Sequence, residues 1–199
     1  MATLILTPEH QIQRLNAVLN KVGELQELSF AQWVQVPHAK SWNLLEVLEH
    51  LSIAYGLYEE KILRALHEAP ELSGTPWSFN ARWWQKFVIE GQRPKGTKRP
   101  FKMKTLKRFE PLLNREELNA THGKIVFAEF LVNHQKLKAS IIESRGKDMN
   151  HRTITSAVGP LVKFYLPEAF FLQLLTNLRA NKFCTAIVHT LFAVGVFGI

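Results

Sequence analysis

Apolar residues recur every three or four positions in four stretches of the chain, which is the period of one face of an α-helix. The first stretch follows Thr7 and Pro8, a capping residue and a proline at the first helical position, and fades near Leu28. The second follows Ser41, its expected cap, and ends before Pro70. Its apolar face is broader, which predicts a central place in a bundle. The apolar positions of the two stretches are Ile12, Leu15, Leu19, Val22 and Leu25, then Leu44, Leu45, Val47, Leu48, Leu51, Ala54, Tyr55, Tyr58, Ile62 and Leu66.

Two further helices are expected in the second half of the chain. Asn114 and Glu117 have the spacing of a capping box, so we predict that the third helix begins there and stops at Gly146. The fourth begins near Pro167, after an extended run over residues 161–165. Four helices in 199 residues predict a single all-α domain, an up-down four-helix bundle.

The connection between the second and third helices, residues 68–114, is long and irregular. Its prolines and glycines interrupt any sustained helical period. Its aromatic residues indicate that it packs on the bundle, with a short helix expected near residues 81–89. A connection of this length inside a compact domain is uncommon unless it has a function.

The net charge of +8 is concentrated in this connection. Between Gly91 and Phe109 no acidic residue lies among the basic ones, which are Arg93, Lys95, Lys98, Arg99, Lys102, Lys104, Lys107 and Arg108. One interpretation is a loop that contacts phosphates, with Phe101 and Phe109 stacking on bases. The other is a solvated loop that apolar residues pin to the bundle, and we favour it because most charge runs are solvated. Nucleic-acid contact through residues 93–108 is therefore the lesser alternative.

Two histidines fall on helical faces that also carry apolar residues. His50 shares its face with Val47, Leu51 and Ala54, and His134 lies near the apolar positions of the third helix. Such a histidine is either a ligand or a hydrogen-bonded core residue, and spacing alone favours the core residue. The lone Cys184 excludes an internal disulfide and is best interpreted as an inert thiol. The residues by themselves identify no reaction.

Three segments resemble the DinB-like superfamily, a group of four-helix bundles that includes bacillithiol transferases. Residues 41–51 read SWNLLEVLEHL and are similar to its second-helix signature. Residues 102–111 (KMKTLKRFEP) resemble the segment before its third helix, and residues 154–164 (ITSAVGPLVKF) resemble the approach to its fourth. The likeness covers about residues 8–175.

The resemblance implies a mononuclear zinc or nickel site with three histidine ligands. His50 matches the ligand from the second helix, and the other two would fall at positions 176 and 180. This chain has Thr176 and Ala180 there, and neither side chain replaces an imidazole. We therefore expect a relative of metal-dependent hydrolases and thiol transferases with an incomplete metal site and an unspecified small-molecule substrate. The alternative is a non-catalytic binding or scaffold protein, and a homodimer is compatible with either because dimers are common among such bundles.

Residues 183–199 carry no charged side chain. They fit the end of a buried helix, a short membrane anchor, or a tail translated in another frame. Read one base earlier, Thr176 and Asn177 can encode His-Glu, although Ala180 cannot become His by the same shift. The apolar run is short for a membrane span, and the N-terminus lacks a secretion signal. We therefore expect a cytoplasmic protein without a membrane partner.

Overall fold

The computed structural model describes residues 5–36, 41–80, 105–150, 152–157, 159, 161–170 and 173. Most of these residues are helical, which confirms the predicted helical class. The helices are α1 (Pro8–Gln26), α2 (Phe30–Val34), α3 (Leu44–Glu68) and α5 (Ala120–Glu143), with the 3₁₀ turns η1 (Lys107–Phe109) and η2 (Ser144–Gly146). Residues 166–170 and 173 are also helical, as predicted for the beginning of a fourth helix.

Side-chain caps explain where the long helices begin. The Thr7 hydroxyl accepts a hydrogen bond from the His10 amide, so α1 begins as predicted. The predicted cap of α3 is wrong by two residues. Asn43, not Ser41, caps it, in a reciprocal capping box with Glu46.

The predicted beginning of the third helix is also wrong. Asn119 caps α5 and accepts from the amides of Thr121 and His122, both at 3.0 Å. Asn114 instead accepts from the Glu116 amide within an isolated turn. An Asn side chain makes the same kind of bond to a nearby amide in a turn as at a helix cap, so the two are alike in sequence. At the other end, α5 stops at Glu143, and Gly146 ends the 3₁₀ turn η2.

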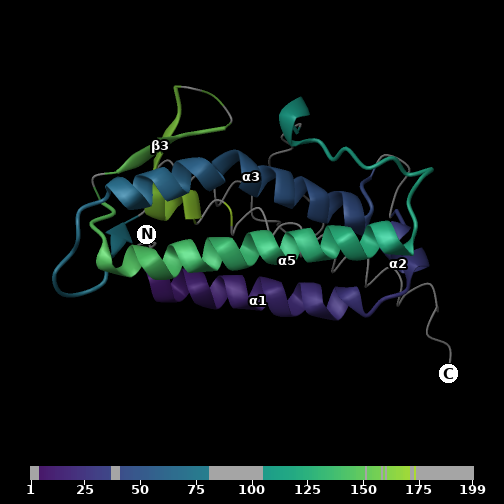
Figure 1. Cartoon of the computed structure of the whole chain (residues 1–199), viewed down its shortest axis with the longest axis horizontal. Helices are drawn as coiled ribbons and strands as arrows, with labels where there is room; N and C mark the ends of the chain where they lie inside the picture. Colours follow the sequence, from purple (N-terminus) through teal and green to yellow (C-terminus); the bar gives the residue numbers. More distant parts are fainter. Residues whose placement is uncertain are drawn as a thin grey trace.

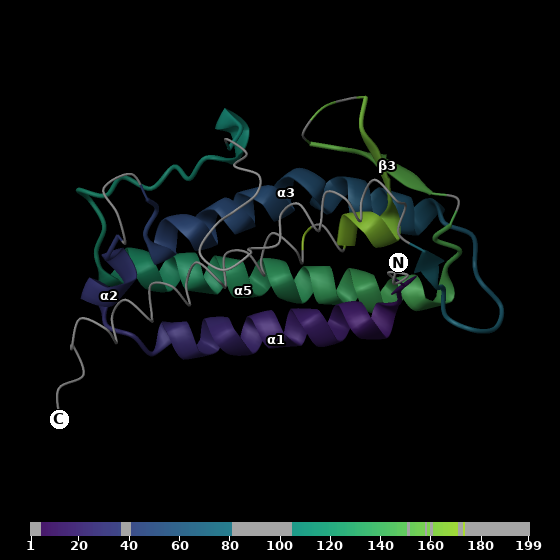
Figure 2. The ribbon, with the colours of Figure 1, turned by 180° about the vertical axis from the view of Figure 1, so that it is seen from behind.

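The three long helices do not alternate in direction. In Figures 1 and 2, α3 and α5 begin at the same end of the molecule, and α1 runs the opposite way. The core contacts agree, because Leu45 near the beginning of α3 clusters with Phe127 near the beginning of α5. The up-down expectation is therefore wrong for α3 and α5. Residues 69–119 carry the chain back to the end where α3 begins, which short loops cannot do.

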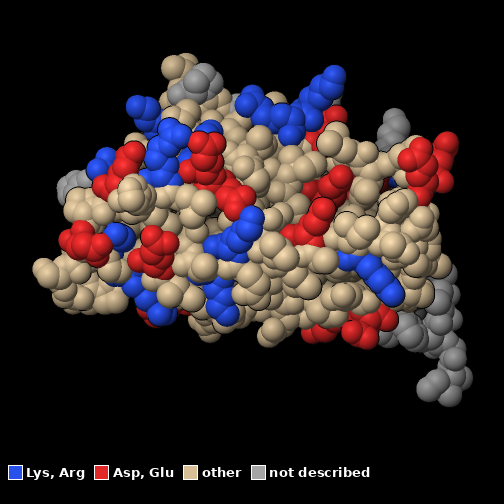
Figure 3. Space-filling view, viewed as in Figure 1, with Lys and Arg blue, Asp and Glu red and all other residues tan. Residues whose placement is uncertain are grey.

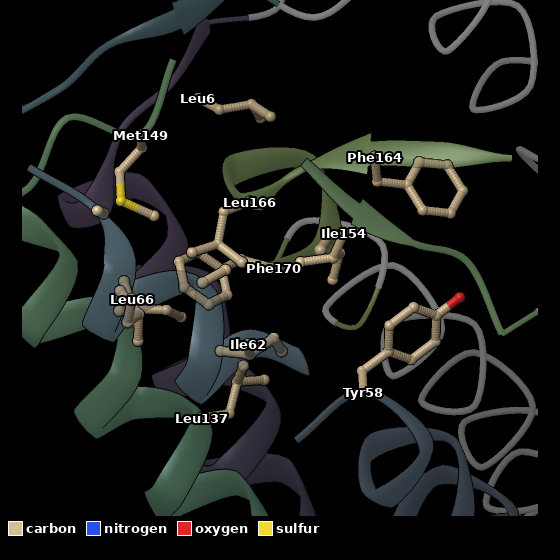
Figure 4. Packing of buried hydrophobic residues seen from close by; sticks show 14 of the residues in the cluster. Leu6, Tyr58, Ile62, Leu66, Leu137, Met149, Ile154, Phe164, Leu166 and Phe170 are labelled. Carbon is tan, nitrogen blue, oxygen red and sulfur yellow. The ribbon is translucent and has the colours of Figure 1, made fainter. Parts of the chain in front are cut away.

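Two apolar clusters fill the space between the helices. One lies at the end where α3 begins and is built from α1, α2, α3 and α5 around Trp33 and Phe127. The other surrounds the last turns of α3 and α5 and contains Ile62, Leu137 and Phe170 (Figure 4). The helical residues 166–170 join this second cluster, with Phe170 fully buried. The beginning of the predicted fourth helix therefore packs on the other helices.

Two small antiparallel sheets complete the described structure. Strand β1 (Ile5–Leu6) pairs with β2 (Phe79–Asn80), and β3 (Thr153–Thr155) pairs with β4 (Lys163–Tyr165). The extended run predicted before the fourth helix is thus the second strand of a hairpin. The Tyr58 hydroxyl accepts from the Ala157 amide at 2.9 Å and lies 3.1 Å from the Ser156 hydroxyl, which fastens the hairpin to α3.

Candidate functional site around His50

One face of α3 holds a segment of the α3–α5 connection, residues 109–115, which we name the strap. Glu46, Glu49 and His50 lie on this face because residues three and four apart are neighbours on a helix. One Glu49 carboxylate oxygen accepts from the amides of Leu112 and Leu113, at 2.8 and 3.0 Å. The strap therefore runs beside the imidazole of His50.

The His50 ring has a fixed orientation. Its Nδ1 lies 2.5 Å from the carbonyl oxygen of Phe109. A carbonyl only accepts, so Nδ1 carries the proton and Nε2 keeps its lone pair. The rings of Trp42 and Phe109 flank the imidazole, with centroids at 4.9 and 6.4 Å. A backbone carbonyl that orients an imidazole in this way is common behind metal-ligating histidines.

Burial lowers the pKa of His50 below its ordinary value of 6.5, while the hydrogen bond to Phe109 acts in the opposite direction. Burial is the larger cause because it removes water from the charged imidazolium. The imidazole is therefore neutral at pH 7, which is the form that a metal ligand or a general base requires.

An ion pair holds the end of the strap to α3. Arg115 donates from Nε and Nη2 to the two carboxylate oxygens of Glu46, both at 2.8 Å, and from Nη2 to the Ser41 carbonyl. The Glu46 side chain is 8% exposed and that of Arg115 is 45% exposed. The hydrogen bond to Glu46 raises the pKa of Arg115. Beside this pair, Trp42, Glu110 and Asn114 line a shallow groove.

The described residues do not fit a metal centre. Across the described ranges, no group of three or more His, Cys, Asp or Glu side chains converges on one point. His134 is buried, as predicted, but its Nδ1 donates to the Phe130 carbonyl at 2.7 Å, and its ring stacks on Phe130. Positions 176 and 180 lie outside the described residues. His50 is one oriented imidazole, and one imidazole does not hold a catalytic metal.

Most of the basic segment, with Phe101, lies outside the described residues, and so does the short helix predicted near residues 81–89. Within the described part, Lys107 and Arg108 are exposed on η1, and Phe109 is partly buried against the core. Lys and Arg side chains appear along the edge of the molecule where η1 lies (Figure 3). Phe109 therefore packs as the solvated-loop interpretation predicts, while Leu106 is exposed and does not.

The apolar tail, residues 183–199 with Cys184, also lies outside the described residues. Among the helices of the described part, none is long and apolar enough to cross a membrane.

His50 was identifiable from the sequence, but the residues that hold the strap were not predicted. Glu49 is one residue before His50 and was interpreted only as part of a motif. Arg115 lies between Asn114 and Glu117, where the sequence predicted the beginning of a helix that in fact begins after Asn119. The spacing of Glu46, Glu49 and His50 could have indicated a polar face on this helix. The sequence does not show which loop that face contacts.

Comparison with known proteins does not assign the chain. No family model matches it, and neither does a curated protein or a solved structure. The likeness to the DinB-like superfamily rests on the three segments quoted above.

Proposed function

We propose that this chain is a DinB-like four-helix bundle with an incomplete metal site, and that it acts as a non-catalytic binding protein. The site keeps one oriented imidazole and has lost the other two. The hydrogen bond from His50 Nδ1 to the Phe109 carbonyl supports a remnant metal site, because it leaves Nε2 as the nitrogen able to coordinate. Thr176 and Ala180 support the non-catalytic function, because neither side chain replaces an imidazole ligand.

The arrangement of the helices supports this bundle. Residues 166–170 enter the same apolar cluster as α3 and α5, where a fourth helix of a bundle would begin. Because α3 and α5 run in the same direction, a long connection has to return the chain to the end where α3 begins. Part of that connection, residues 102–111, is the segment that resembles the family. That segment contains Phe109, the residue whose carbonyl orients His50.

The competing function is a metal-dependent hydrolase or thiol transferase. The neutral imidazole of His50 favours it, since a ligand has to be unprotonated. Thr176 and Ala180 oppose it, because neither provides a nitrogen or thiolate ligand. The two functions differ in the metal content of the protein.

Elemental analysis of the full chain, purified without chelators, distinguishes the two functions. We expect zinc and nickel well below stoichiometric amounts, with the same result for His50→Ala. His122→Ala is the matched control, because Nδ1 of His122 also bonds a backbone carbonyl, that of Glu117, on the surface. A stoichiometric metal that His50→Ala removes and His122→Ala retains would overturn the proposal in favour of the metalloenzyme.

A further inference from the structure

Two leucines are far more exposed than the other large apolar side chains of the described residues. Leu161 is 96% exposed and Leu112 is 83% exposed, whereas the next, Val132, is 55% exposed. Leu161 lies in the turn of the β3–β4 hairpin, and Leu112 lies in the strap. Both segments lie on the side of α3 that faces away from α1 (Figures 1 and 2). One side of the molecule therefore carries both leucines.

The fold holds the strap so that Leu112 stays in solvent. The Leu112 amide donates to Oε2 of Glu49 at 2.8 Å, and the Leu113 amide donates to the same oxygen. The Leu113 side chain is partly buried against the apolar cluster around Trp33. The backbone on this side of the strap is thus fixed to α3, and Leu112 is exposed from a segment that is already ordered.

The hairpin that carries Leu161 is ordered in the same way. The Ser156 amide donates to the Val162 carbonyl at 2.8 Å, and the Val162 amide donates to the Gly159 carbonyl at 3.2 Å, which closes the turn. Phe164, in the strand that follows, is buried in the second apolar cluster. Because both loops are ordered before any partner binds, little conformational entropy is lost on binding.

Basic side chains lie beside both leucines. Lys163 follows the hairpin turn, and Lys107 and Arg108 lie on η1, and all three are exposed. Glu110 is the one acidic residue between positions 105 and 115 of the sequence. Lys and Arg side chains appear along this edge of the molecule in Figure 3. The chain as a whole has a net charge of +8, so this side is complementary to a negatively charged surface.

The exposed groups favour an anionic lipid surface over a nucleic acid. Proteins that bind single-stranded nucleic acid stack bases on aromatic side chains, but Phe109 packs against the core and flanks His50. The side chains that are exposed beside the basic residues are aliphatic. Aliphatic side chains gain free energy at the boundary between lipid headgroups and acyl chains, where basic residues also meet phosphates.

We propose that this side of the chain docks reversibly on an anionic membrane surface. Leu112 and Leu161 insert at the level of the headgroups, and Lys107, Arg108 and Lys163 contact lipid phosphates. The sequence-based expectation of no membrane partner rested on the lack of a spanning segment, which a peripheral contact does not need. The contact does not involve His50, so it goes beyond the proposed function and does not depend on it.

Co-sedimentation of the full chain with lipid vesicles tests the two leucines. The vesicles are phosphatidylcholine with about a third phosphatidylserine, or phosphatidylcholine alone, at low salt. The wild type binds the anionic vesicles more tightly, and Leu112→Gln with Leu161→Gln weakens this binding at least about tenfold. Val132→Gln with Ile142→Gln is the matched control, because both residues are exposed on α5, and it binds like the wild type. Circular dichroism shows that both variants fold.

The basic residues give a second comparison in the same assay. Lys107→Gln with Arg108→Gln weakens binding to the anionic vesicles and makes it less sensitive to salt, because fewer phosphates are contacted. Lys124→Gln with Lys138→Gln removes the same net charge from α5. This control retains more of the binding than the pair on η1 does.

A wild type that does not bind the anionic vesicles at low salt would overturn the proposal. Binding that the two leucine substitutions leave unchanged would do the same, because it would be electrostatic attraction without insertion. Binding to a single-stranded oligonucleotide but not to vesicles, lost in Lys107→Gln with Arg108→Gln, would assign this side to nucleic acid instead.

Discussion

At the scale of single residues, His50 and Arg115 determine how α3 is joined to the strap. His50 bonds the Phe109 carbonyl, and Arg115 bonds the Glu46 carboxylate. Their contributions to stability can be measured separately. That of His50 depends on pH, and that of Arg115 is removed by a substitution that removes its charge.

Burial of His50 makes stability depend on pH. Its pKa in the folded protein lies below the ordinary 6.5, so the unfolded chain binds a proton first as the pH falls. The contribution of His50 is therefore fully present above pH 6.5 and is lost as the pH falls through the folded pKa. Urea unfolding at pH 7 and pH 5 should show a larger loss for the wild type than for His50→Gln. An equal loss would contradict the lowered pKa.

Arg115→Ala should destabilise the fold by about 1–3 kcal/mol, because it leaves the buried Glu46 carboxylate without its cation. Arg64→Ala is the control. Arg64 also pairs with a glutamate, Glu60, but both side chains are largely exposed, and its loss should cost about 0.5 kcal/mol or less. Thermal unfolding of the two variants gives the comparison. Equal effects would mean that the strap is not held by this pair.

At the scale of elements, α5 packs against the Trp33 ring of α2 at Gly123. A Cβ atom at this position would lie 2.8 Å from Cε3 of Trp33, whose indole nitrogen donates to the Leu25 carbonyl. This hydrogen bond holds the ring against α5, so a Cβ atom at position 123 requires the ring or the helix to shift. Gly123 is the point at which the packing of α2 against α5 requires glycine.

Gly123→Ala should lower the free energy of unfolding by about 1–3 kcal/mol through this clash. Gly56→Ala, in the interior of α3, provides the reverse case. Beyond its own helical backbone, a Cβ atom there meets nothing within 4 Å, so alanine should stabilise the helix by up to about 1 kcal/mol. Chemical denaturation of both variants measures the difference in sign. A stabilising Gly123→Ala would show that Trp33 moves freely.

The sequence predicted those helix boundaries that a nearby capping residue or proline determines. Thr7 and Pro8 located the beginning of α1, and Pro70 bounded the end of α3. The helix α2 was missed because five residues carry no period, although Ser29 and Gln32 form a capping box that could have indicated it. The cap of α5 was misplaced because Asn114 and Asn119 are both able to bond a nearby amide, and only packing decides between them.

At the scale of the whole molecule, the relative direction of the helices could not be predicted from the sequence. Apolar periodicity shows which face of α5 is buried but is the same for either direction of the chain. The length of the α3–α5 connection allowed a return to the beginning of α3, and the core contacts show that it occurs. Likewise, the sequence predicted an inward His50, whereas the structure half-buries it beneath the strap. Its partner carbonyl, 59 residues away, could not be predicted.

The central claim is that His50 is the remaining ligand of a three-histidine site in a DinB-like bundle. Restoring the two missing imidazoles with Thr176→His and Ala180→His tests it most directly, by zinc titration of the full chain. We expect about one tightly bound zinc per chain in this double variant, lost when His50→Ala is added. A double variant that binds no zinc, or binds it equally well without His50, would contradict the account.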